Sequence, residues 1–406
     1  MSVTSAMQSG VSGLLSSGEA LSVIGNNIAN VSTTGFKEGR TLFADLLSST
    51  INNGQIGDGS QVQGVQNIFS QGTLETTGSS TDLAIQGDGL FVLQGANSTQ
   101  QYYSRAGAFA FNSNNILTDP NGNEVLGYGM SDLIKGTSNG VLGAIDLANF
   151  STMAPKATST LSVTANLDSS SSPPANSWDP TQANFNPTTA SNFSTSATVY
   201  DSQGNAKSLT LYFANTGANT WNLYTYDGTT YTAAGAGTPL TFDATSGALT
   251  SPSPATISSN GLTIDLTGST QFATASAVSS QTQNGYAAGS ETSVSIDSQG
   301  IVNVQYSNSQ TQKIAQVALA TFASPTGLNS VGGNLYSATT ASGAAVINNT
   351  SNLSNNTIAS NTLEQSNVDL GDQLTQLITI QQAYEANSKT ITTADEMMQA
   401  VLNVIK

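Results

Sequence analysis

Acidic side chains are the groups in this sequence that could do chemistry. The 406 residues include 25 Asp and Glu against 9 Lys and Arg, with no His and no Cys. Without His or Cys, the chain cannot form a disulfide, a zinc finger or a Ser–His–Asp triad. Two carboxylates could hydrolyse a glycosidic bond, but the sequence singles out no pair among so many acids. We therefore expect no enzyme, no catalytic residue and no cofactor.

Acidic turns raise the question of calcium, above all residues 119–124. An EF-hand loop needs alternating oxygen ligands, a Gly at the sixth position and a Glu at the twelfth. Here the Gly is fourth, and the segment lies between two expected strands. We interpret it, and the turns that begin at Asp201 and Asp297, as hairpin turns rather than metal sites.

The remaining candidate groups point to structure. Arg40 and Arg105 are the only arginines, and each is expected to form a structural ion pair. Residues 87–89 lack the spacing and the flanking helix of a dinucleotide loop. The formal net charge of −16 argues against binding nucleic acid or anionic membranes through a basic patch. Function is therefore expected in surfaces rather than in a reactive pocket.

Both ends of the chain show the seven-residue repeat of packed helices. The N-terminal repeat is Met7, Leu14, Leu21 and Ile28. The C-terminal repeat is Leu370, Leu377, Tyr384, Ile391, Met398 and Ile405. Leu374 and Leu402 lie at the second apolar position of the same heptad, which together with the first would form the seam between packed helices. These residues are the candidates for packing between subunits.

The N-terminal helix is poorly suited to stand alone. Residues 1–36 carry one charge, Glu19, although a helix exposed on one face normally solvates that face with charged residues. Four glycines also weaken it by up to about 1 kcal/mol each. We expect the terminal helices to pair and to pack against neighbouring chains; pairing within one chain only, or capping of the central core, remains the alternative.

The middle of the chain predicts strands and turns. Residues alternate between apolar and polar in 161–167, 208–213 and 301–306, and turn signals separate such runs. Ser/Pro-rich segments near 169–187 and 251–259 suggest an insertion. The predicted fold class is α+β and multi-domain, with two mainly antiparallel β domains between paired terminal helices. The predicted domains are 1–70 with 356–406 (helical core and linker), 71–144 with 286–355 (inner β domain) and 145–285 (outer β domain).

No targeting segment is apparent. The first basic residue is Lys37, so the basic start of a secretory signal peptide is missing. No apolar run approaches the roughly 18–20 residues that span a bilayer. We expect a chain that is cytoplasmic or exported by a route that reads no such signal, without membrane insertion.

Several motifs, in order along the chain, resemble those of the bacterial flagellar rod and hook protein family. They are residues 26–37, 70–75, 82–91, 104–109, 363–370 and 381–389. The family often has Arg where this chain has Gln382. Residues at the positions of the family signature are Asn27, Asn30, Gly35, Phe36, Lys37, Asn367, Glu385 and Asn387.

Length and the insertion indicate a hook-type member, because residues 198–213 resemble the outer domain of hook subunits. The resemblance implies a subunit of a curved tube that transmits torque from rod to filament and encloses an export channel. It also implies an extracellular location in the flagellar hook, self-association, and contacts with rod proteins, a hook cap, hook–filament junction proteins and the flagellar type III export apparatus. A distal rod protein is the alternative; a secreted β-rich adhesin or glycan-active enzyme is a remote one.

Overall fold

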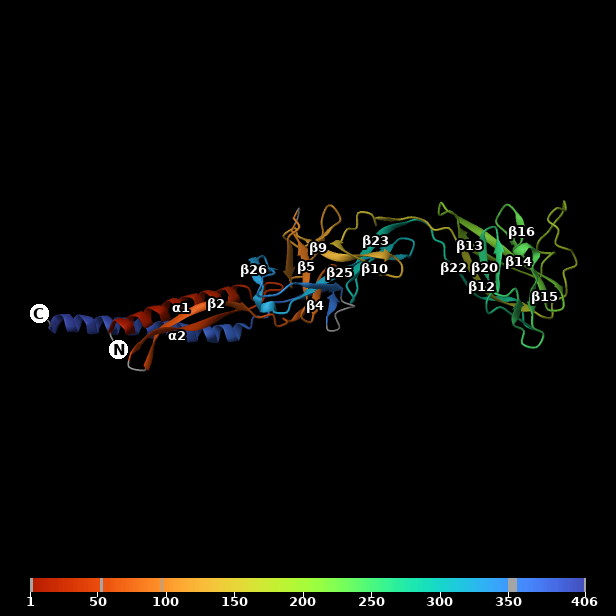
Figure 1. The fold of residues 1–406 in the computed structure, drawn as a ribbon. Helices are drawn as coiled ribbons and strands as arrows, with labels where there is room; N and C mark the ends of the chain where they lie inside the picture. Colours follow the sequence, from red (N-terminus) through yellow and green to blue (C-terminus); the bar gives the residue numbers. More distant parts are fainter. Residues whose placement is uncertain (1–2, 52–53, 96–97, 350–355, 405–406) are drawn as a thin grey trace. The chain divides into compact units, whose positions relative to one another are not determined.

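The computed structural model describes residues 3–51, 54–95, 98–349 and 356–404 (Figure 1). Its contacts divide the chain into two compact units. The helix-bearing unit comprises Met1–Phe150, Ser293–Gln305 and Thr311–Lys406, and the sandwich unit comprises Ser151–Thr292 and Tyr306–Gln310. The domain bounds expected from the sequence remain predictions, since this division does not separate the helices from the first β domain.

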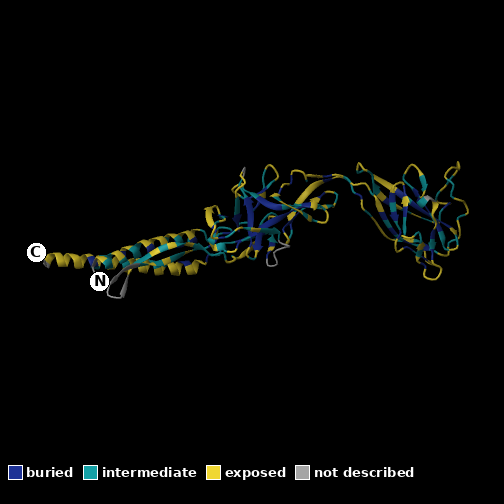
Figure 2. Cartoon of the chain, viewed as in Figure 1, coloured by how far each residue is buried: buried dark blue, intermediate teal, exposed yellow. Residues whose placement is uncertain are grey.

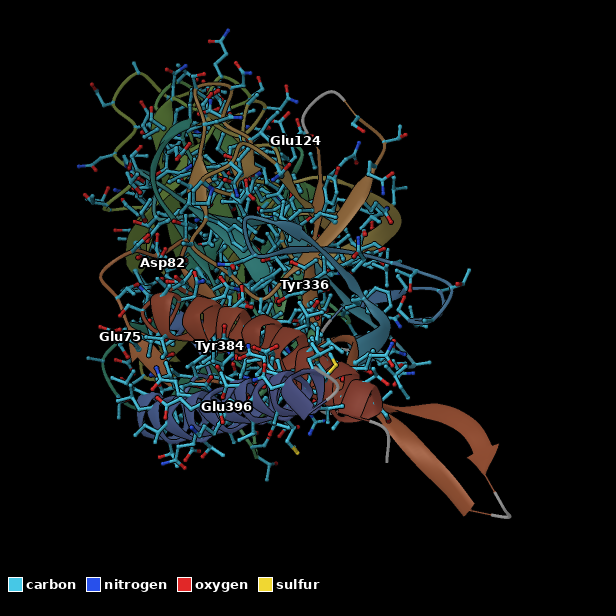
Figure 3. The ribbon with its side chains drawn as sticks, turned by 90° about the vertical axis from the view of Figure 1, so that its left-hand side faces the viewer. Glu75, Asp82, Glu124, Tyr336, Tyr384 and Glu396 are labelled. Carbon is cyan, nitrogen blue, oxygen red and sulfur yellow. The ribbon has the colours of Figure 1, made fainter. Side chains whose placement is uncertain are left out.

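Two long helices and a hairpin form one end of the helix-bearing unit. Helix α1 spans Val3–Ala29, helix α2 spans Leu370–Val404, and the two pack together, as the repeats predict. Strands β1 (Gly39–Ile51) and β2 (Gly54–Asn67) pair antiparallel and contact α1. Figure 3 shows the helices side by side, with this hairpin standing off to one side of them.

The rest of the helix-bearing unit is a β domain. Its main sheet has the strand order β24-β25-β9-β5-β6-β27-β26, and every neighbouring pair in this order is antiparallel. Its core includes Leu90, Val92 and Phe322. The strands of this domain are β3 (Leu74–Thr76), β4 (Leu83–Gln86), β5 (Leu90–Gln94), β6 (Gln101–Ser104), β7 (Ala110–Phe111), β8 (Leu117–Thr118), β9 (Glu124–Asp132), β10 (Thr137–Ala144), β24 (Ile301–Tyr306), β25 (Thr311–Thr321), β26 (Asn329–Gly332), β27 (Leu335–Ser337), β28 (Val346–Asn349), β29 (Thr357–Ser360) and β30 (Thr362–Glu364).

The sandwich unit holds two further sheets. One has the order β19-β20-β12-β21 with β22 also paired to β12, and the other has the order β13-β14-β15-β17-β18 with β16 paired to β15. Its strands are β11 (Thr152–Met153), β12 (Thr160–Asp168), β13 (Phe193–Tyr200), β14 (Ala206–Gly217), β15 (Thr220–Tyr226), β16 (Tyr231–Ala233), β17 (Leu240–Phe242), β18 (Leu249–Ser251), β19 (Thr256–Ser259), β20 (Leu262–Asp265), β21 (Thr270–Phe272), β22 (Ala277–Gln283) and β23 (Gly289–Ile296), which continues into the other unit.

Alternation builds the core of the sandwich unit. Along β12 and β15 every second residue is buried, and the buried faces supply Leu161, Val163, Trp221 and Leu223 to one apolar cluster. That cluster draws on both sheets, so the sheets pack face to face (Figure 2 shows their buried residues). Strand β12 pairs parallel with β20 and β21, so this sheet is mixed rather than wholly antiparallel.

The two chain segments next to the helices meet beside the β domain. Strand β3 pairs antiparallel with β30, and β4 pairs antiparallel with β29. These short ladders bring residues 74–86 alongside residues 357–364, which lead into α2. Residues that follow α1 and residues that precede α2 therefore share one junction at the base of the helix pair.

Turns at acidic residues lie where hairpins were predicted. Between β8 and β9, the backbone amides of Asn121 and Asn123 donate to Asp119 Oδ1 at 2.9 and 2.7 Å. Gly122 has φ +84°, a conformation that favours glycine. The carboxylate is thus used within its own turn. Across the described ranges, no group of three or more acidic side chains is placed to hold a metal ion.

Candidate assembly surface

Helices α1 and α2 run antiparallel and approach closely at two glycines. A Cβ added to Gly10 would lie 2.9 Å from Ile391 Cγ1, and one added to Gly13 would lie 2.6 Å from Asn387 Nδ2. Near the other end of the pair, Asn27 Nδ2 donates to Gln373 Oε1 at 3.0 Å. The sequence numbers fall along α1 as they rise along α2, which fixes the antiparallel direction.

The predicted apolar repeat of α1 lies along the side of its most buried line. Met7, Leu14, Leu21 and Ile28 are all half-buried, whereas Ala20 and Ile24 are buried. Buried Ser16 donates to the carbonyl of Ser60 in the hairpin at 2.9 Å. The helix is therefore held between α2 and the hairpin, and its repeat is only partly covered by its own chain.

Helix α2 carries some apolar residues that α1 covers and others that stay exposed. Leu377 and Ile391 are half-buried, while Gln373 and Ala394 are buried. Other residues of the predicted repeat are exposed, including Tyr384 (42%) and Met398 (38%). Ile405 lies outside the described residues. The exposed apolar residues that we call the α2 outer face are Leu370, Leu374, Ile378, Met397, Val401 and Leu402, all 45% or more exposed.

A buried ion cluster lies at the junction below the helices. Lys37 Nζ lies 2.6 Å from Glu364 Oε1, and Arg105 Nη1 lies 3.3 Å from Glu364 Oε2. All three side chains are at most 1% exposed. Burial lowers the pKa of the Lys37 ammonium and of the Arg105 guanidinium, while the Glu364 carboxylate opposes both shifts. One carboxylate thus holds the segment after α1 and the β domain together.

Asn27 at the same junction links α1 to both neighbouring segments. Its side chain donates to the carbonyl of Gly39 at 2.8 Å and accepts from the Gly39 amide at 2.9 Å. Gln373, which receives a further hydrogen bond from Asn27, donates to Glu38 Oε1 at 2.9 Å. This network fixes where α2 begins relative to the end of α1.

Asn367 closes the junction from the C-terminal side. Its Oδ1 accepts the Glu38 amide at 2.8 Å, and its Nδ2 donates to the carbonyl of Ile68 at 2.8 Å. Gly35 has φ +70°, and its amide donates to the Glu364 carbonyl at 2.7 Å. A Cβ at Gly35 would lie 2.4 Å from the Ala106 nitrogen, so only glycine fits there.

The other signature positions are less central. Asn30 Nδ2 donates to the carbonyl of Asn26 at 2.9 Å near the end of α1, and Phe36 is half-buried. Asn387 faces Gly13 in the helix seam, while Glu385 is exposed. The structure therefore brings Asn27, Gly35, Lys37 and Asn367 together at the junction and leaves Glu385 on the surface.

Sequence reasoning missed two features of this surface. The hairpin of β1 and β2 lies in residues treated as a linker, although Asn53-Gly54 is a strong hairpin signal. The role of Glu364 was also missed, because no local pattern pairs it with Lys37. Arg105 forms the expected ion pair. Arg40 instead donates to Gln66 Oε1 at 2.7 Å, with no carboxylate partner among the described residues.

Neither helix has both the length and the apolar character that crossing a membrane would require, over the parts of the chain that are described.

Four family models match successive parts of the chain. The model described as "Flagella basal body rod protein" matches residues 7–37, and "Flagellar hook protein FlgE/F/G D1 domain" matches 84–166. The model described as "Flagellar basal body protein FlaE D2 domain" matches 166–286, and "Flagellar basal body rod FlgEFG protein C-terminal" matches 359–404.

Curated relatives match over the full length. The chain is 35% identical over 419 residues to the flagellar hook protein FlgE of Escherichia coli (strain K12), covering 98% of this chain and 100% of that protein. It is 34% identical to flagellar hook protein FlgE of Salmonella typhimurium, covering 97% and 98%. The crystal structure of Helicobacter pylori flagellar hook protein FlgE2 matches with a TM-score of 0.54 at 15% identity, covering 72% of this chain and all of that one, which shows the fold.

Proposed function

The chain belongs to the flagellar hook protein FlgE family, and on that premise we propose how it works as a hook subunit. Subunits polymerise into a curved, flexible tube that transmits torque from rod to filament and encloses an export channel. The terminal helices make the contacts that hold this tube together. The role is structural, with no catalytic step.

The α2 outer face is the observation that carries this proposal. Its six large apolar side chains are 45% or more exposed, and exposed apolar side chains gathered on one element are typical of a contact surface. The chain's own α1 packs along α2 but leaves these side chains uncovered. A helix with such exposed apolar side chains fits a place between several helices, which neighbouring subunits of a homopolymer would supply.

The near absence of charge on α1 supports the same arrangement. Its 27 residues include one charged side chain, Glu19. A helix with one face permanently in water would normally carry Lys and Glu there. Packing of the half-buried repeat Met7, Leu14, Leu21 and Ile28 against a neighbouring subunit would complete its burial.

The proposed location and partners follow from family membership. Members of this family belong to the bacterial flagellum, and we place this chain outside the cell, in the hook. Its neighbours would be rod proteins at one end and hook–filament junction proteins at the other, with a hook cap during growth. Export would use the flagellar type III apparatus.

Substituting an outer-face residue tests the proposal. Leu374→Asp places a charge on a surface that we expect to be buried between subunits, and Leu377→Asp places one in the helix seam. Both variants should fail to form tubes visible by electron microscopy, while tryptophan fluorescence shows the sandwich unit still folded.

The matched control is Ile134→Asp, which adds the same charge at an apolar residue of the β domain that is 61% exposed. This variant should polymerise normally. Tubes of ordinary length from Leu374→Asp and Leu377→Asp would contradict the proposed role of the terminal helices.

A further inference from the structure

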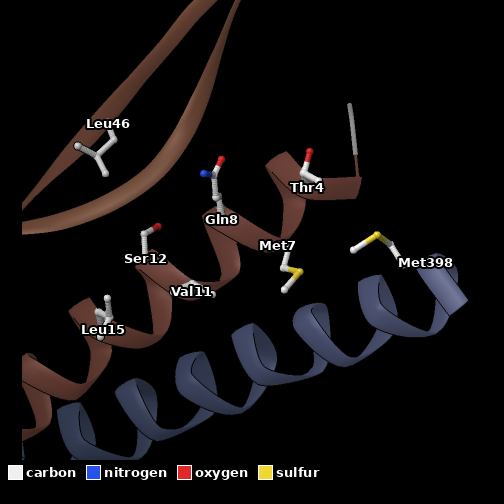
Figure 4. A pocket seen from close by; sticks show the side chains of 8 residues that line it. All are labelled: Thr4, Met7, Gln8, Val11, Ser12, Leu15, Leu46 and Met398. Carbon is white, nitrogen blue, oxygen red and sulfur yellow. The ribbon is translucent and has the colours of Figure 1, made fainter.

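The apolar groove at the start of α1 carries no group suited to covalent chemistry. It encloses about 550 Å³, and beside three uncharged polar side chains it is lined by Met7, Val11, Leu15, Leu46 of the hairpin and Met398 of α2 (Figure 4). None of these side chains is charged or carries a thiol. Groups that could react covalently therefore lie elsewhere in the chain.

Five asparagines of the sequence precede a glycine, and such a pair can react without an enzyme. They are Asn53, Asn121, Asn139, Asn260 and Asn284. A glycine has no side chain to shield its backbone nitrogen, so this nitrogen can approach the carboxamide of the residue before it. Asn53 lies outside the described residues. The other four differ in what their reacting atoms contact.

Asn139 lies in a bulge of the hairpin that β9 and β10 form. The register shifts between Ser138 and Leu142, so residues 139–141 lie opposite Gly129 alone. A bulge interrupts the ladder of backbone hydrogen bonds. A Cβ at Gly129 would lie 2.9 Å from Asn139 Nδ2, which places the Asn139 side chain over this glycine. The bulge thus leaves Asn139 and the residue after it to bond locally.

The local hydrogen bonds at Asn139 have the directions that an attack by the next nitrogen requires. The Val141 amide donates to Asn139 Oδ1 at 2.9 Å. This oxygen gains negative charge when Asn139 Cγ is attacked, and a donor already in place stabilises such charge. The Gly140 amide donates to Ser138 Oγ at 3.1 Å, so a hydroxyl lies where the attacking nitrogen must lose its proton. The bond from Val141 also closes a ring of atoms that contains the Gly140 nitrogen.

We propose that Asn139 is a site of spontaneous deamidation in this chain. The Gly140 nitrogen loses its proton through the Ser138 hydroxyl to water and attacks Asn139 Cγ. A bond forms between these two atoms, the bond from Cγ to Nδ2 breaks, and Nδ2 takes a proton from water and leaves as ammonia. Water then opens the cyclic imide, which leaves aspartate or isoaspartate at position 139. Water is the only co-reactant.

A hollow beside the bulge gives water access to Asn139. It encloses about 340 Å³, and its lining includes Gly129, Asn139, Val141 and Asp146. The product carboxylate would add a second negative charge to this lining, next to that of Asp146. The reaction does not require polymerisation, so its outcome leaves the proposed function untouched.

Asn121 and Asn260 lack a donor to the oxygen that would gain charge. No hydrogen bond reaches Oδ1 of either residue from the parts of the chain that are described. Their Nδ2 atoms instead donate to Asp119 Oδ2 at 3.4 Å and to Asp227 Oδ2 at 3.5 Å. A carboxylate beside the carboxamide opposes the negative charge that attack creates. Both residues should therefore react more slowly than Asn139.

Asn284 is held against another segment of the chain. Its Oδ1 accepts the amides of Ser159 and Thr160 at 3.0 and 3.1 Å. Gly285 is buried, and its amide donates to Gln283 Oε1. Breaking even one such hydrogen bond beforehand lowers the reactive population about fivefold. Asn284 should therefore be protected.

Ageing of the purified full chain tests the site. The protein is kept in mildly alkaline buffer made with water labelled with heavy oxygen, so that only deamidation during the experiment adds the label. Peptide mass spectrometry then gives the rate at each asparagine, and isoaspartyl methyltransferase counts isoaspartate. We expect Asn139 to react about fivefold faster than Asn121, Asn260 or Asn284. A faster reaction at any of these three would overturn the proposal.

The same chain unfolded in urea separates the effect of the bulge from that of the Asn–Gly pair itself. Without a fold, the four pairs should react at similar rates, so the advantage of Asn139 should disappear. If Asn139 kept its advantage in urea, the neighbouring sequence rather than the folded bulge would control the rate, and the proposal would be wrong.

Ser138→Ala tests the path of the proton. It removes the hydroxyl that accepts the Gly140 amide and should slow the reaction at Asn139 about fivefold. Ser131→Ala is the matched control, since Ser131 is exposed in the same hairpin and its hydroxyl donates to the Thr137 carbonyl at 3.0 Å. The control should react at the rate of the natural chain. An unchanged rate in Ser138→Ala, or equal slowing in both variants, would count against the role of the Ser138 hydroxyl and overturn the mechanism.

Discussion

At the scale of single residues, Glu364 unites parts of the chain that are far apart in sequence. It is separated from Lys37 by 327 positions and from Arg105 by 259. A buried carboxylate that meets two cations is held strongly in place, because removing any member leaves an uncompensated buried charge. The cluster therefore ties the order of both terminal segments to the folding of the β domain.

Glu364→Gln should loosen this junction. The substitution leaves Lys37 and Arg105 buried without their carboxylate, a change that typically costs about 3–5 kcal/mol. Hydrogen exchange should show faster exchange at the Gly35 amide, which donates to the Glu364 carbonyl, and at the Gly72 amide, which donates to Glu364 Oε1.

Lys207→Gln is the control for charge alone. Lys207 lies 3.5 Å from Asp201 in a pair whose side chains are 56% and 24% exposed. Such a surface pair contributes at most about 1 kcal/mol. If Glu364→Gln and Lys207→Gln lowered stability equally, burial would not strengthen the contribution of the Glu364 cluster.

The junction marks the limit of what one sequence predicts about individual residues. Lys37 and Glu364 lie in segments that resemble family motifs, and Arg105 was expected to form an ion pair. The partnership itself depends on the register of β3 with β30, which places Glu364 opposite Leu74. The register between two strands that are distant in sequence depends on how whole elements pack. A local sequence pattern therefore cannot predict it.

At the scale of elements, the four glycines of α1 divide into two classes. A Cβ would collide with α2 at Gly10 and Gly13, but would meet nothing within 4 Å at Gly18 and Gly25. The first pair allows the helices to approach closely. The second pair only weakens the helix as far as one chain is concerned.

Gly13→Ala and Gly18→Ala should therefore have opposite effects on the thermal stability of the tubes. Alanine improves an exposed helical position by about 1 kcal/mol, so Gly18→Ala should raise the temperature at which tubes lose their helical circular dichroism. Gly13→Ala pushes against the Asn387 side chain and should lower that temperature. The same response from both variants would show that the close approach at Gly13 is unimportant.

Periodicity predicted the helices, their pairing and the alternating strand at 161–167, and the structure confirms these elements. It did not show which side of α2 meets α1. Gln373 and Ala394 are buried, whereas Leu374 and Leu402 at the expected second seam position are exposed. Because apolar residues occur at several helical positions of α2, the repeat alone does not show which of them meet α1, and their role between subunits remains a prediction.

At the scale of the whole molecule, the acidic residues are used to hold turns. In the sandwich unit, six Asp carboxylates accept hydrogen bonds from residues just after them, which lowers their pKa values. They are Asp168, Asp179, Asp201, Asp227, Asp243 and Asp265. The excess acid noted in the sequence thus has a structural use in the loops of this unit.

Acid should destabilise the sandwich unit. Because the pKa of these carboxylates is lower in the folded state, the unfolded chain takes up protons first as the pH falls below about 4. The stabilisation is fully present above that pH and is lost as the pH falls through the folded pKa values. Thermal melts followed by fluorescence of Trp178 and Trp221, both in this unit, should show a melting temperature that falls as the pH is lowered from about 4 towards 2.

Asp227→Asn separates this effect from the general loss of negative charge. The pKa of the Asp227 carboxylate is lowered most by the hydrogen bond from the backbone amide of Thr230, and next by the hydrogen bonds from Thr229. The variant should melt lower at neutral pH and respond less to acid. An unchanged acid response would mean that relief of charge repulsion or other groups control the pH dependence.

Two residues near the ends of the main segment of the sandwich unit are paired through their backbones. The Lys156 amide donates to the Tyr286 carbonyl at 3.0 Å, and the Tyr286 amide donates to the Lys156 carbonyl at 2.9 Å. The residues between Lys156 and Tyr286 therefore form a loop whose two ends are held together. Since closure entropy grows only slowly with loop length, evolution or an engineer could lengthen, shorten or replace this segment at little thermodynamic penalty to the remainder.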